Sequence, residues 1–342
     1  MLVNAEEMAK SMKLRRLLLV ILLCATIGFA MWLWRVPDFV SIPEPEENHE
    51  KAIEKFNAIE KAESALPLRP EGHSRLLTQG RKTERVFVLV HGVTNCPEQY
   101  MRLAHILYAS GANVVIPRAR YAGFADRLNA IQGFQSGQDL LDQVATGLDI
   151  ASGLGNRISL VGVSGGAVAA AWMAQNRDNI ESVVVVSPFF GIRGQPVALV
   201  DAVSAILNRG PNFYFWWNAK EKEAVGPIYA YPRFGTRSIA STLELSRAVR
   251  DHLASHPLRA GRMAILTSAG DIGANSEQTK QLALQWEQYN PGRVSIYEFP
   301  EPLGIPHDMI DPGQPDAKIQ ITYPKILELL GVKLLSGQTE LE

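Results

Sequence analysis

The most informative part of the sequence for the fold is residues 160–170, LVGVSGGAVAA. Within it, Gly162–Gly166 match the pattern G-x-S-x-G. An apolar, β-branched run, RISLV, precedes the pattern, and a helical run, AVAAAWMAQN, follows it. A serine on a sharp turn between a strand and a helix has unfavourable backbone angles, which small neighbours make possible. The stretch predicts that Ser164 is a nucleophile; the alternative is a glycine-rich turn that binds an anion or nothing.

Short β-branched runs alternate with amphipathic helical runs from Arg85 onward. The predicted strands are RVFVLVHG (85–92), ANVVIPR (112–118), RISLVGV (157–163), SVVVVSPF (182–189), RMAILTSAGD (262–271) and RVSIYEFP (293–300), with SRLLTQ (74–79) as a candidate seventh. The strands lack strict alternation of apolar and polar residues, as strands buried on both faces do. The chain is therefore predicted to have an α/β fold: a mostly parallel central sheet with helices on both faces.

One connection is much longer than the others. Residues 191–260 separate two predicted strands by far more than a usual loop, and they contain the aromatic cluster PNFYFWWNAK. We expect a helical lid over the edge of the sheet. The aromatic side chains of this lid, Phe213 to Trp217, either line an entry for apolar substrates or form the ordinary core of the lid.

A nucleophilic serine needs a base, and the base needs an acid that orients it. His307 lies in the loop after the last predicted strand, and Asp271 lies in the loop after the strand RMAILTS. Such loops converge at the carboxyl edge of a parallel sheet. The chain order Ser164, Asp271, His307 is the order that a fold with this serine turn requires.

Other residues compete for these roles or complete them. Asp308 and Asp311 are rival acids, but both are close to His307 in sequence, and Glu277 is a weaker rival on the next helix. Two backbone N–H groups should bind the developing oxyanion. We expect these from Gly165, directly after the serine, and Val93, in the loop HGVTNCP. His91 in the same loop is expected to bond the loop rather than to transfer protons.

Four motifs, LVHGVTNCPEQY, GVSGGA, TSAGD and PHDMIDP, in this order and spacing, resemble the α/β-hydrolase superfamily. The similarity covers roughly residues 85–331 and is greatest to the carboxylesterase, monoglyceride-lipase and serine-aminopeptidase-like branch. The resemblance implies an eight-stranded sheet, a triad of Ser164, Asp271 and His307, and oxyanion donors at Val93 and Gly165, but it implies no substrate. A GHG-like turn of many relatives is replaced here by PRARYAGFADR.

The N-terminal region carries a candidate membrane segment. Four basic residues, Lys10, Lys13, Arg15 and Arg16, precede an uncharged run of membrane-spanning length, 17–34, which ends with Trp32 and Trp34. A retained anchor is favoured over a cleaved secretory signal, whose cleavage site would lie at 28–30. Either alternative leaves the N-terminus cytoplasmic and the body periplasmic or extracellular, and cleavage would make the protein secreted.

These observations divide the chain into three parts. Residues 1–36 are the anchor or signal, 37–65 are a Pro- and Glu-rich linker with an amphipathic helix, and 66–335 are the hydrolase domain with the insertion 191–260. A net charge of −1 gives no indication of nucleic-acid binding. The two cysteines, Cys24 and Cys96, lie far apart in the sequence, which disfavours a disulfide framework or a cysteine metal site.

The sequence predicts a serine hydrolase that cleaves carboxylic esters through an acyl-enzyme, with no metal or organic cofactor required. The membrane segment favours lipid or monoacylglycerol-like esters. Peptide or thioester cleavage is the alternative chemistry. A membrane-tethered binding protein that keeps the fold without turnover is the alternative from a different class. The predicted partners are a small ester or lipid and the membrane, but not nucleic acid.

Overall fold

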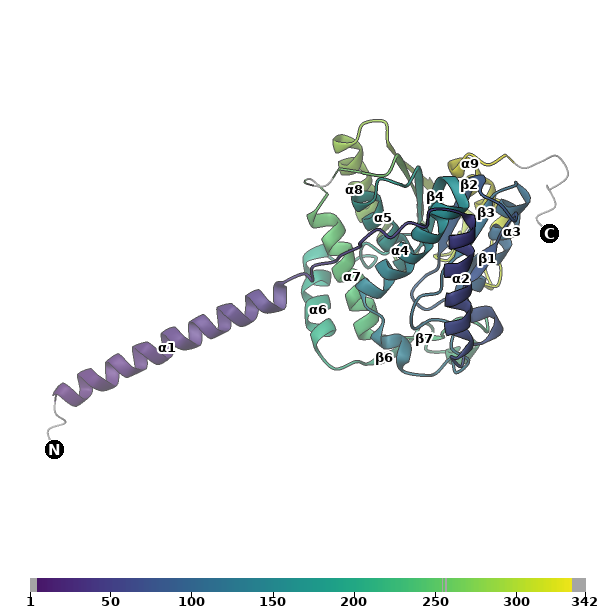
Figure 1. Ribbon diagram of the computed structural model, residues 1–342. Coiled ribbons are helices and arrows are strands. Elements are labelled where there is room, and N and C mark those ends of the chain that lie inside the picture. Colours follow the sequence, from purple (N-terminus) through teal and green to yellow (C-terminus); the bar gives the residue numbers. More distant parts are fainter. Residues whose placement is uncertain (1–4, 254, 256, 334–342) are drawn as a thin grey trace. The chain divides into compact units, whose positions relative to one another are not determined.

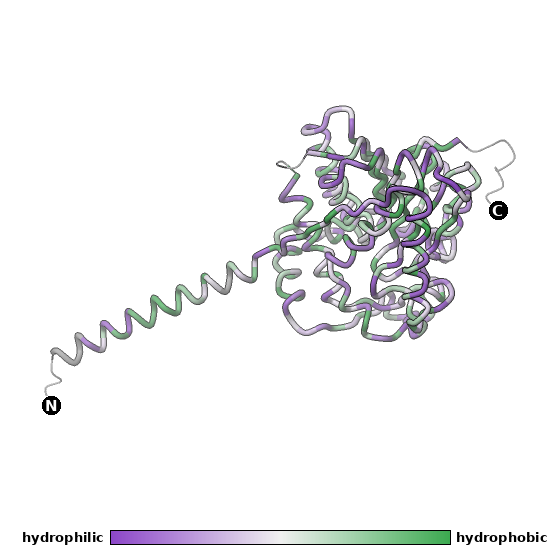
Figure 2. The backbone as a smooth tube through the Cα atoms, in the orientation of Figure 1, coloured by the Kyte–Doolittle hydropathy of each residue, from purple (hydrophilic) through white to green (hydrophobic). Residues whose placement is uncertain are grey.

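The computed structural model describes residues 5–253, 255 and 257–333. The chain forms two compact units, Met1–Pro37 and Asp38–Glu342, and the predicted end of the hydrolase domain at 335 lies outside the described residues. The first unit consists of helix α1 (Ala5–Trp34). Within it, Lys10–Trp34 is long and apolar enough to cross a membrane, a test that a signal sequence also passes. Figure 2 colours much of this helix as hydrophobic.

The second unit is built on a sheet of seven strands in the order β1-β3-β2-β4-β5-β8-β9 (Figure 1). The strands are β1 (Arg75–Leu77), β2 (Thr83–Val90), β3 (Asn113–Ile116), β4 (Gly155–Val163), β5 (Ser182–Val186), β8 (Arg262–Ser268) and β9 (Val294–Phe299). Every pairing is parallel except that of β1, which runs antiparallel to β3 at the edge. The predicted fold class is confirmed.

The sheet has one strand fewer, among the described residues, than the resemblance to the superfamily implies. The candidate seventh strand, SRLLTQ, forms the short edge strand β1. The residues before it form helix α2 (His49–Ser64), because Ala52 and Phe56 recur at helical spacing and are buried. No further strand is formed there to pair with β1.

The helices of the unit lie on both faces of the sheet (Figure 1). After α2 they are α3 (Met101–Ala109), α4 (Gly137–Leu154), α5 (Gly165–Asn176), α6 (Val197–Arg209), α7 (Thr236–Asp251), α8 (Ser276–Tyr289) and α9 (Ile319–Leu330). Five 3₁₀-helices are also described: η1 (Pro70–Gly72), η2 (Pro97–Tyr100), η3 (Ile131–Phe134), η4 (Lys222–Ala224) and η5 (Glu301–Leu303).

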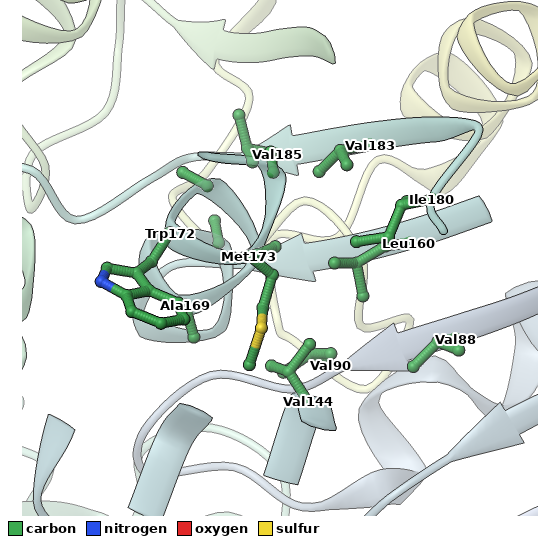
Figure 3. Packing of buried hydrophobic residues seen from close by; sticks show 14 of the residues in the cluster. Val88, Val90, Val144, Leu160, Ala169, Trp172, Met173, Ile180, Val183 and Val185 are labelled. Atoms are coloured by element: carbon green, nitrogen blue, oxygen red, sulfur yellow. The ribbon is translucent and has the colours of Figure 1, made fainter. Parts of the chain in front are cut away.

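Alternate residues of the central strands enter two separate cores. In β2, Val86, Val88 and Val90 belong to one cluster, and Phe87 and Leu89 belong to the other. Figure 3 shows the first cluster, in which strand residues face helix residues: Val88, Val90, Leu160, Val183 and Val185 against Val144, Ala169, Trp172 and Met173. The second cluster packs the opposite face against α3 and α9. Burial on both faces explains why these strands lack alternation in the sequence.

Residues of the predicted linker make specific contacts within the second unit. The backbone N–H of Val40 donates to Gln138 Oε1 at 3.1 Å, and Gln138 Nε2 donates to the Val40 carbonyl at 2.7 Å. Phe39 packs against the first core cluster. Farther along, the buried Glu63 at the end of α2 accepts hydrogen bonds from Ser74 Oγ at 2.7 Å and Arg118 Nε at 3.0 Å. These contacts attach α2, and the segment that precedes it, to the rest of the second unit.

The long insertion contains α6, the hairpin of β6 (Tyr214–Trp216) and β7 (Arg233–Gly235), and α7. α6 is joined to α7 by two ion pairs, Arg209 Nη1–Glu244 Oε1 at 2.6 Å and Arg250–Asp201. α7 also supplies Leu245 to the first core cluster. The first part of the insertion is therefore attached to α7, which itself packs against one face of the sheet.

Candidate active site

Ser164 lies between the end of β4 and the first residue of α5, with φ of 55° and ψ of −118°. A non-glycine residue with positive φ is strained by about 1–3 kcal/mol. The neighbouring glycines are required by close packing: a Cβ on Gly162 would lie 2.4 Å from the Gly166 carbonyl oxygen, and one on Gly166 would lie 2.6 Å from the His91 carbonyl oxygen. The G-x-S-x-G pattern therefore forms the sharp turn that was predicted.

At the carboxyl edge of the sheet, the structure brings Ser164, on the turn between β4 and α5, together with His307 and Asp271, which lie on two loops. His307 Nε2 lies 2.9 Å from Ser164 Oγ, and His307 Nδ1 lies 2.7 Å from Asp271 Oδ2. An ionised carboxylate can only accept, so the proton is on Nδ1 and Nε2 is free to accept the serine proton. The side chain of Asp271 is buried, whereas that of His307 is 29% exposed.

The charge of Asp271 stabilises the imidazolium that His307 forms when it takes a proton. Burial lowers the pKa of His307, but the charge and hydrogen bond of Asp271, together with the charge of Asp308, raise it above 6.5 overall. Burial raises the pKa of Asp271, but His307 and the N–H groups of Gly273 and Ala274, at 2.8 and 3.0 Å, lower it overall. The carboxylate is therefore ionised and aligned with the histidine.

The rival acids make other contacts. Asp308 Oδ2 accepts from Gln99 Nε2 at 2.7 Å and from Gln314 Nε2 at 2.9 Å. Asp311 Oδ1 accepts from the hydroxyl of Tyr229 at 2.6 Å, and burial together with the charge of Asp308 raises the pKa of Asp311 to about 6. Glu277 lies on α8. The carboxylate that contacts the ring of His307 is that of Asp271.

The two expected oxyanion donors lie next to each other beside Ser164. A Cβ on Gly165 would lie 2.3 Å from Val93 Cγ2, and a Cβ on Gly92 would lie 3.6 Å from Ser164 Cβ. Gly165 begins α5, so its N–H has no acceptor within the helix. Among the described residues, the N–H of Val93 likewise donates to no protein group.

His91 is buried and bonds the loop, as the sequence analysis expects. Its Nε2 accepts from the N–H of Ala119 at 3.1 Å, and its Nδ1 donates to the Gly92 carbonyl at 2.8 Å. Burial lowers the pKa of His91 to about 4. The ring is therefore neutral, and its two hydrogen bonds fix the loop that carries Gly92 and Val93.

A cavity of ≈ 740 Å³ opens beside Ser164. Its apolar lining includes Phe189, Trp217, Pro227, Ile239 and Ile272, and its polar lining includes Asn95, Gln99, Asp308 and Gln314. Of the predicted aromatic cluster, Trp217 lines the cavity and bonds Thr94 Oγ1 through its Nε1 at 3.0 Å. Trp217, Phe213 and Phe215 are all about half exposed, and of the three only Trp217 lines the cavity. In the described part of the chain, no group of three or more His, Cys, Asp or Glu could hold a metal ion.

Two residues that contact this site were not singled out from the sequence. Arg193, at the start of the insertion, donates from Nη1 to the Asp271 carbonyl at 2.6 Å. Gln99 is buried and accepts the N–H of Gly92 at 2.9 Å. A signal for Gln99 existed, since it lies four residues before Leu103 and eight before Leu107, in line with the apolar stripe of α3. No comparable signal marks Arg193.

Comparison with known proteins agrees with this geometry. The family model described as serine aminopeptidase, S33, matches residues 81–284. A monoacylglycerol lipase from Paleococcus ferrophilus is structurally similar, with a TM-score of 0.58 and 18% identity over 76% of this chain and 98% of that chain.

Two further solved structures are similar. A soluble variant of monoglyceride lipase from Saccharomyces cerevisiae has a TM-score of 0.57 and 12% identity, over 75% of this chain and 90% of that chain. A structure of metagenome-derived lipolytic enzymes, LipS and LipT, has a TM-score of 0.58 and 14% identity, over 77% and 99%. At these identities the likeness shows the fold. A search of curated proteins finds no significant match.

Proposed function

The chain belongs to the serine aminopeptidase S33 family of α/β-hydrolases and is an enzyme of the serine hydrolase type, and on this premise we propose that Ser164, His307 and Asp271 are its catalytic triad. The observation that carries the proposal is the continuous hydrogen-bond chain from the serine through the imidazole to the carboxylate, at 2.9 and 2.7 Å. The strained backbone of Ser164 supports it, because such strain clusters at active sites.

The proposed reaction is acyl transfer from an ester. His307 Nε2 takes the hydroxyl proton as Ser164 Oγ attacks the carbonyl carbon, and the N–H groups of Val93 and Gly165 receive the oxyanion. The imidazolium then protonates the alcohol oxygen as the C–O bond breaks. Water, deprotonated by His307, then attacks the acyl-enzyme, and the imidazolium returns this proton to Ser164 Oγ as the acid leaves. Asp271 keeps the proton on Nδ1 and stabilises the imidazolium.

The substrate we propose is a lipid or monoacylglycerol-like ester. The apolar lining of the cavity, with Trp217 and Ile272, suits an acyl chain, and its volume is within the usual range of about 300–1,000 Å³ for ligand sites. The similar lipases from Paleococcus and yeast support the same substrate class. Peptide or thioester cleavage by the same residues is the alternative, because the family model is named for an aminopeptidase.

We further propose that α1 is retained as a membrane anchor, with its N-terminus cytoplasmic and the hydrolase unit on the other side. Four basic residues before the apolar run and the tryptophans at its end support this orientation. Retention after carbonate extraction of membranes, at the full-length mass, would support the anchor. A mature protein that begins near residue 31 would show cleavage instead.

A fluorophosphonate probe tests the triad directly. We expect labelling of the wild type and none of Ser164→Ala. Ser182→Ala is the matched control, because Ser182 is a buried serine that bonds Ser159 Oγ at the start of β5, at the opposite end of the strands. A labelled Ser164→Ala variant would contradict the proposed triad, because the reactive nucleophile would then be another residue. An unlabelled but folded wild type that binds lipid esters would favour the non-catalytic binding protein.

A panel of p-nitrophenyl esters of graded chain length tests the substrate class. We expect kcat/KM to rise with acyl length, because longer chains cover more of the apolar lining. Aminoacyl p-nitroanilides and acyl thioesters run in parallel test the alternatives. A preference for either of these over every oxygen ester would contradict the proposed substrate.

A further inference from the structure

Gln99 connects the loop of one expected oxyanion donor, Val93, to the loop of the histidine. Its side-chain Oε1 accepts the N–H of Gly92 at 2.9 Å, and its Nε2 donates to Asp308 Oδ2 at 2.7 Å. Gly92 directly precedes Val93, and Asp308 directly follows His307. A single amide side chain, 2% exposed, therefore lies between two backbone segments that the proposed reaction requires in fixed positions.

The orientation of this amide is determined by its partners. A backbone N–H can only donate and a carboxylate can only accept, so the oxygen of Gln99 must face Gly92 and its nitrogen must face Asp308. Asp308 is itself fixed by its own loop, because its Oδ1 accepts the N–H groups of Ile310 and Asp311 at 3.3 and 3.2 Å. The series of hydrogen bonds from Gly92 through Gln99 to Asp308 therefore has one low-energy arrangement.

A second connection runs parallel to the first. Asn95, whose N–H donates to the Gly92 carbonyl at 3.1 Å, also donates from Nδ2 to Asp311 Oδ2 at 3.2 Å. The other oxygen of Asp311 accepts from the hydroxyl of Tyr229 in the insertion. The carboxylate of Asp311 is fully buried. The same donor loop is thus bonded to both carboxylates that follow His307.

We propose that Gln99 and Asp308 are positioning residues that set the distance between one expected oxyanion donor, the N–H of Val93, and His307. This inference rests on the proposed function, since it assigns the two residues a task in that reaction. Neither touches the reacting atoms: Gln99 acts through Gly92 on the N–H of Val93, and Asp308 acts through Gln99. Displaced donors stabilise the transition state less but bind the ground-state ester nearly as well, so kcat should fall while KM changes little.

Gln99→Met tests the inference, because methionine has a similar length and makes neither hydrogen bond. In the full-length enzyme in detergent, we expect kcat for a p-nitrophenyl ester to fall about tenfold or more, short of the roughly 10²–10³-fold loss when an oxyanion donor is removed. KM should change less than about threefold. The Ki of a trifluoromethyl ketone, whose adduct with Ser164 carries an oxyanion, should rise by the same factor as kcat/KM falls.

Paired variants separate positioning from stability. Asp308→Asn can keep its oxygen toward Nε2 of Gln99 and loses only the longer bonds from the N–H groups of Ile310 and Asp311, at 3.3 and 3.2 Å, so it should retain more of the kcat than Asp308→Ala. Gln143→Met is the matched control: Gln143 is a buried amide on α4 that donates to the Pro117 carbonyl at 2.7 Å, and its loss should leave kcat unchanged. If Gln99→Met does not fold, the two Asp308 variants make the same comparison.

Active-site titration with a fluorophosphonate gives kcat per reactive serine. A Gln99→Met enzyme with wild-type kcat per serine and wild-type ketone affinity would overturn the inference, as would a loss equal in the Asn and Ala variants of Asp308. A wild type that neither hydrolyses the ester nor reacts with the probe would overturn the proposed function itself, and the inference with it.

Discussion

Replacing Gly165 by alanine should displace the neighbouring oxyanion donor, the N–H of Val93, without removing it. A Cβ at this position would lie 2.3 Å from Val93 Cγ2, whereas carbon atoms in contact are about 3.5–4.0 Å apart. Val93 must therefore move by more than about 1 Å, and a misplacement of this size costs about 10²-fold in rate. We expect kcat/KM to fall about a hundredfold, which is about 2.7 kcal/mol of transition-state stabilisation.

The same geometry predicts a rescue. Once Val93→Ala removes Cγ2, the remaining Cβ of residue 93 lies 3.7 Å away, an ordinary contact, and Thr242 Cγ2 at 3.3 Å must yield by a few tenths of an ångström. The double variant Gly165→Ala/Val93→Ala should therefore hydrolyse a p-nitrophenyl ester nearly as fast as Val93→Ala alone. Global stability should change little in Gly165→Ala, because alanine at a helix start offsets part of the clash through its helix propensity.

The assay is kcat/KM per fluorophosphonate-reactive serine, with the melting temperature followed by circular dichroism. A fully active Gly165→Ala variant would show that catalysis does not need Val93 in its present position. A double variant as slow as Gly165→Ala itself would refute the predicted rescue, because the loss would then arise from something other than contact with Val93.

Three further predictions concern pH, substrate and stability. Activity should rise with pH as His307 loses its proton, at a midpoint above that of an ordinary histidine, because Asp271 and Asp308 raise the pKa of His307. Asp308→Asn should move that midpoint to lower pH, and an unmoved midpoint in kcat/KM profiles would contradict this. Trp217→Ala should lower kcat/KM for long acyl chains about tenfold but not for acetate, given the apolar area lost, whereas Phe213→Ala, exposed and outside the cavity lining, should change neither. Glu63→Ala leaves Arg118 buried without its carboxylate and should cost about 3–5 kcal/mol in urea unfolding at unchanged kcat per reactive serine; equal stability of variant and wild type would show that the pair contributes nothing.

The sheet and its helices were predictable because the burial of an element determines the spacing of its apolar residues. The strand 182–186 is buried throughout, and after Ser182 it is a continuous run of valines. The turn at Ser164 was predictable because only glycine avoids the carbonyl contacts at 162 and 166. In both cases one local pattern has one physical cause, which needs no knowledge of the rest of the chain.

Contacts between segments far apart in the sequence were not predictable in this way. Proline and glutamate in residues 37–50 predict an extended, polar backbone, but they carry no sign that Val40 bonds Gln138, 98 residues away. Likewise, the sequence around Arg193 predicts only a solvated side chain, and the packing of the insertion brings it to the Asp271 carbonyl. Such partners depend on how loops of particular lengths meet, and a single sequence does not encode that as a repeating pattern.

The difference between local patterns and long-range contacts also separates the parts of the site that the sheet positions from those that loop contacts position. The sheet positions Ser164 and the N–H of Gly165 directly, because both lie where β4 meets α5. His307, Asp271 and Val93 lie on three separate loops, and their relative positions depend on bonds between the loops: Gln99 to Asp308, and Arg193 to Asp271. A parallel sheet brings loop ends together but leaves their tips free to shift by ångströms. Catalytic geometry needs tolerances of about 0.5 Å, so these few side-chain hydrogen bonds, and not the sheet, must supply the remaining precision.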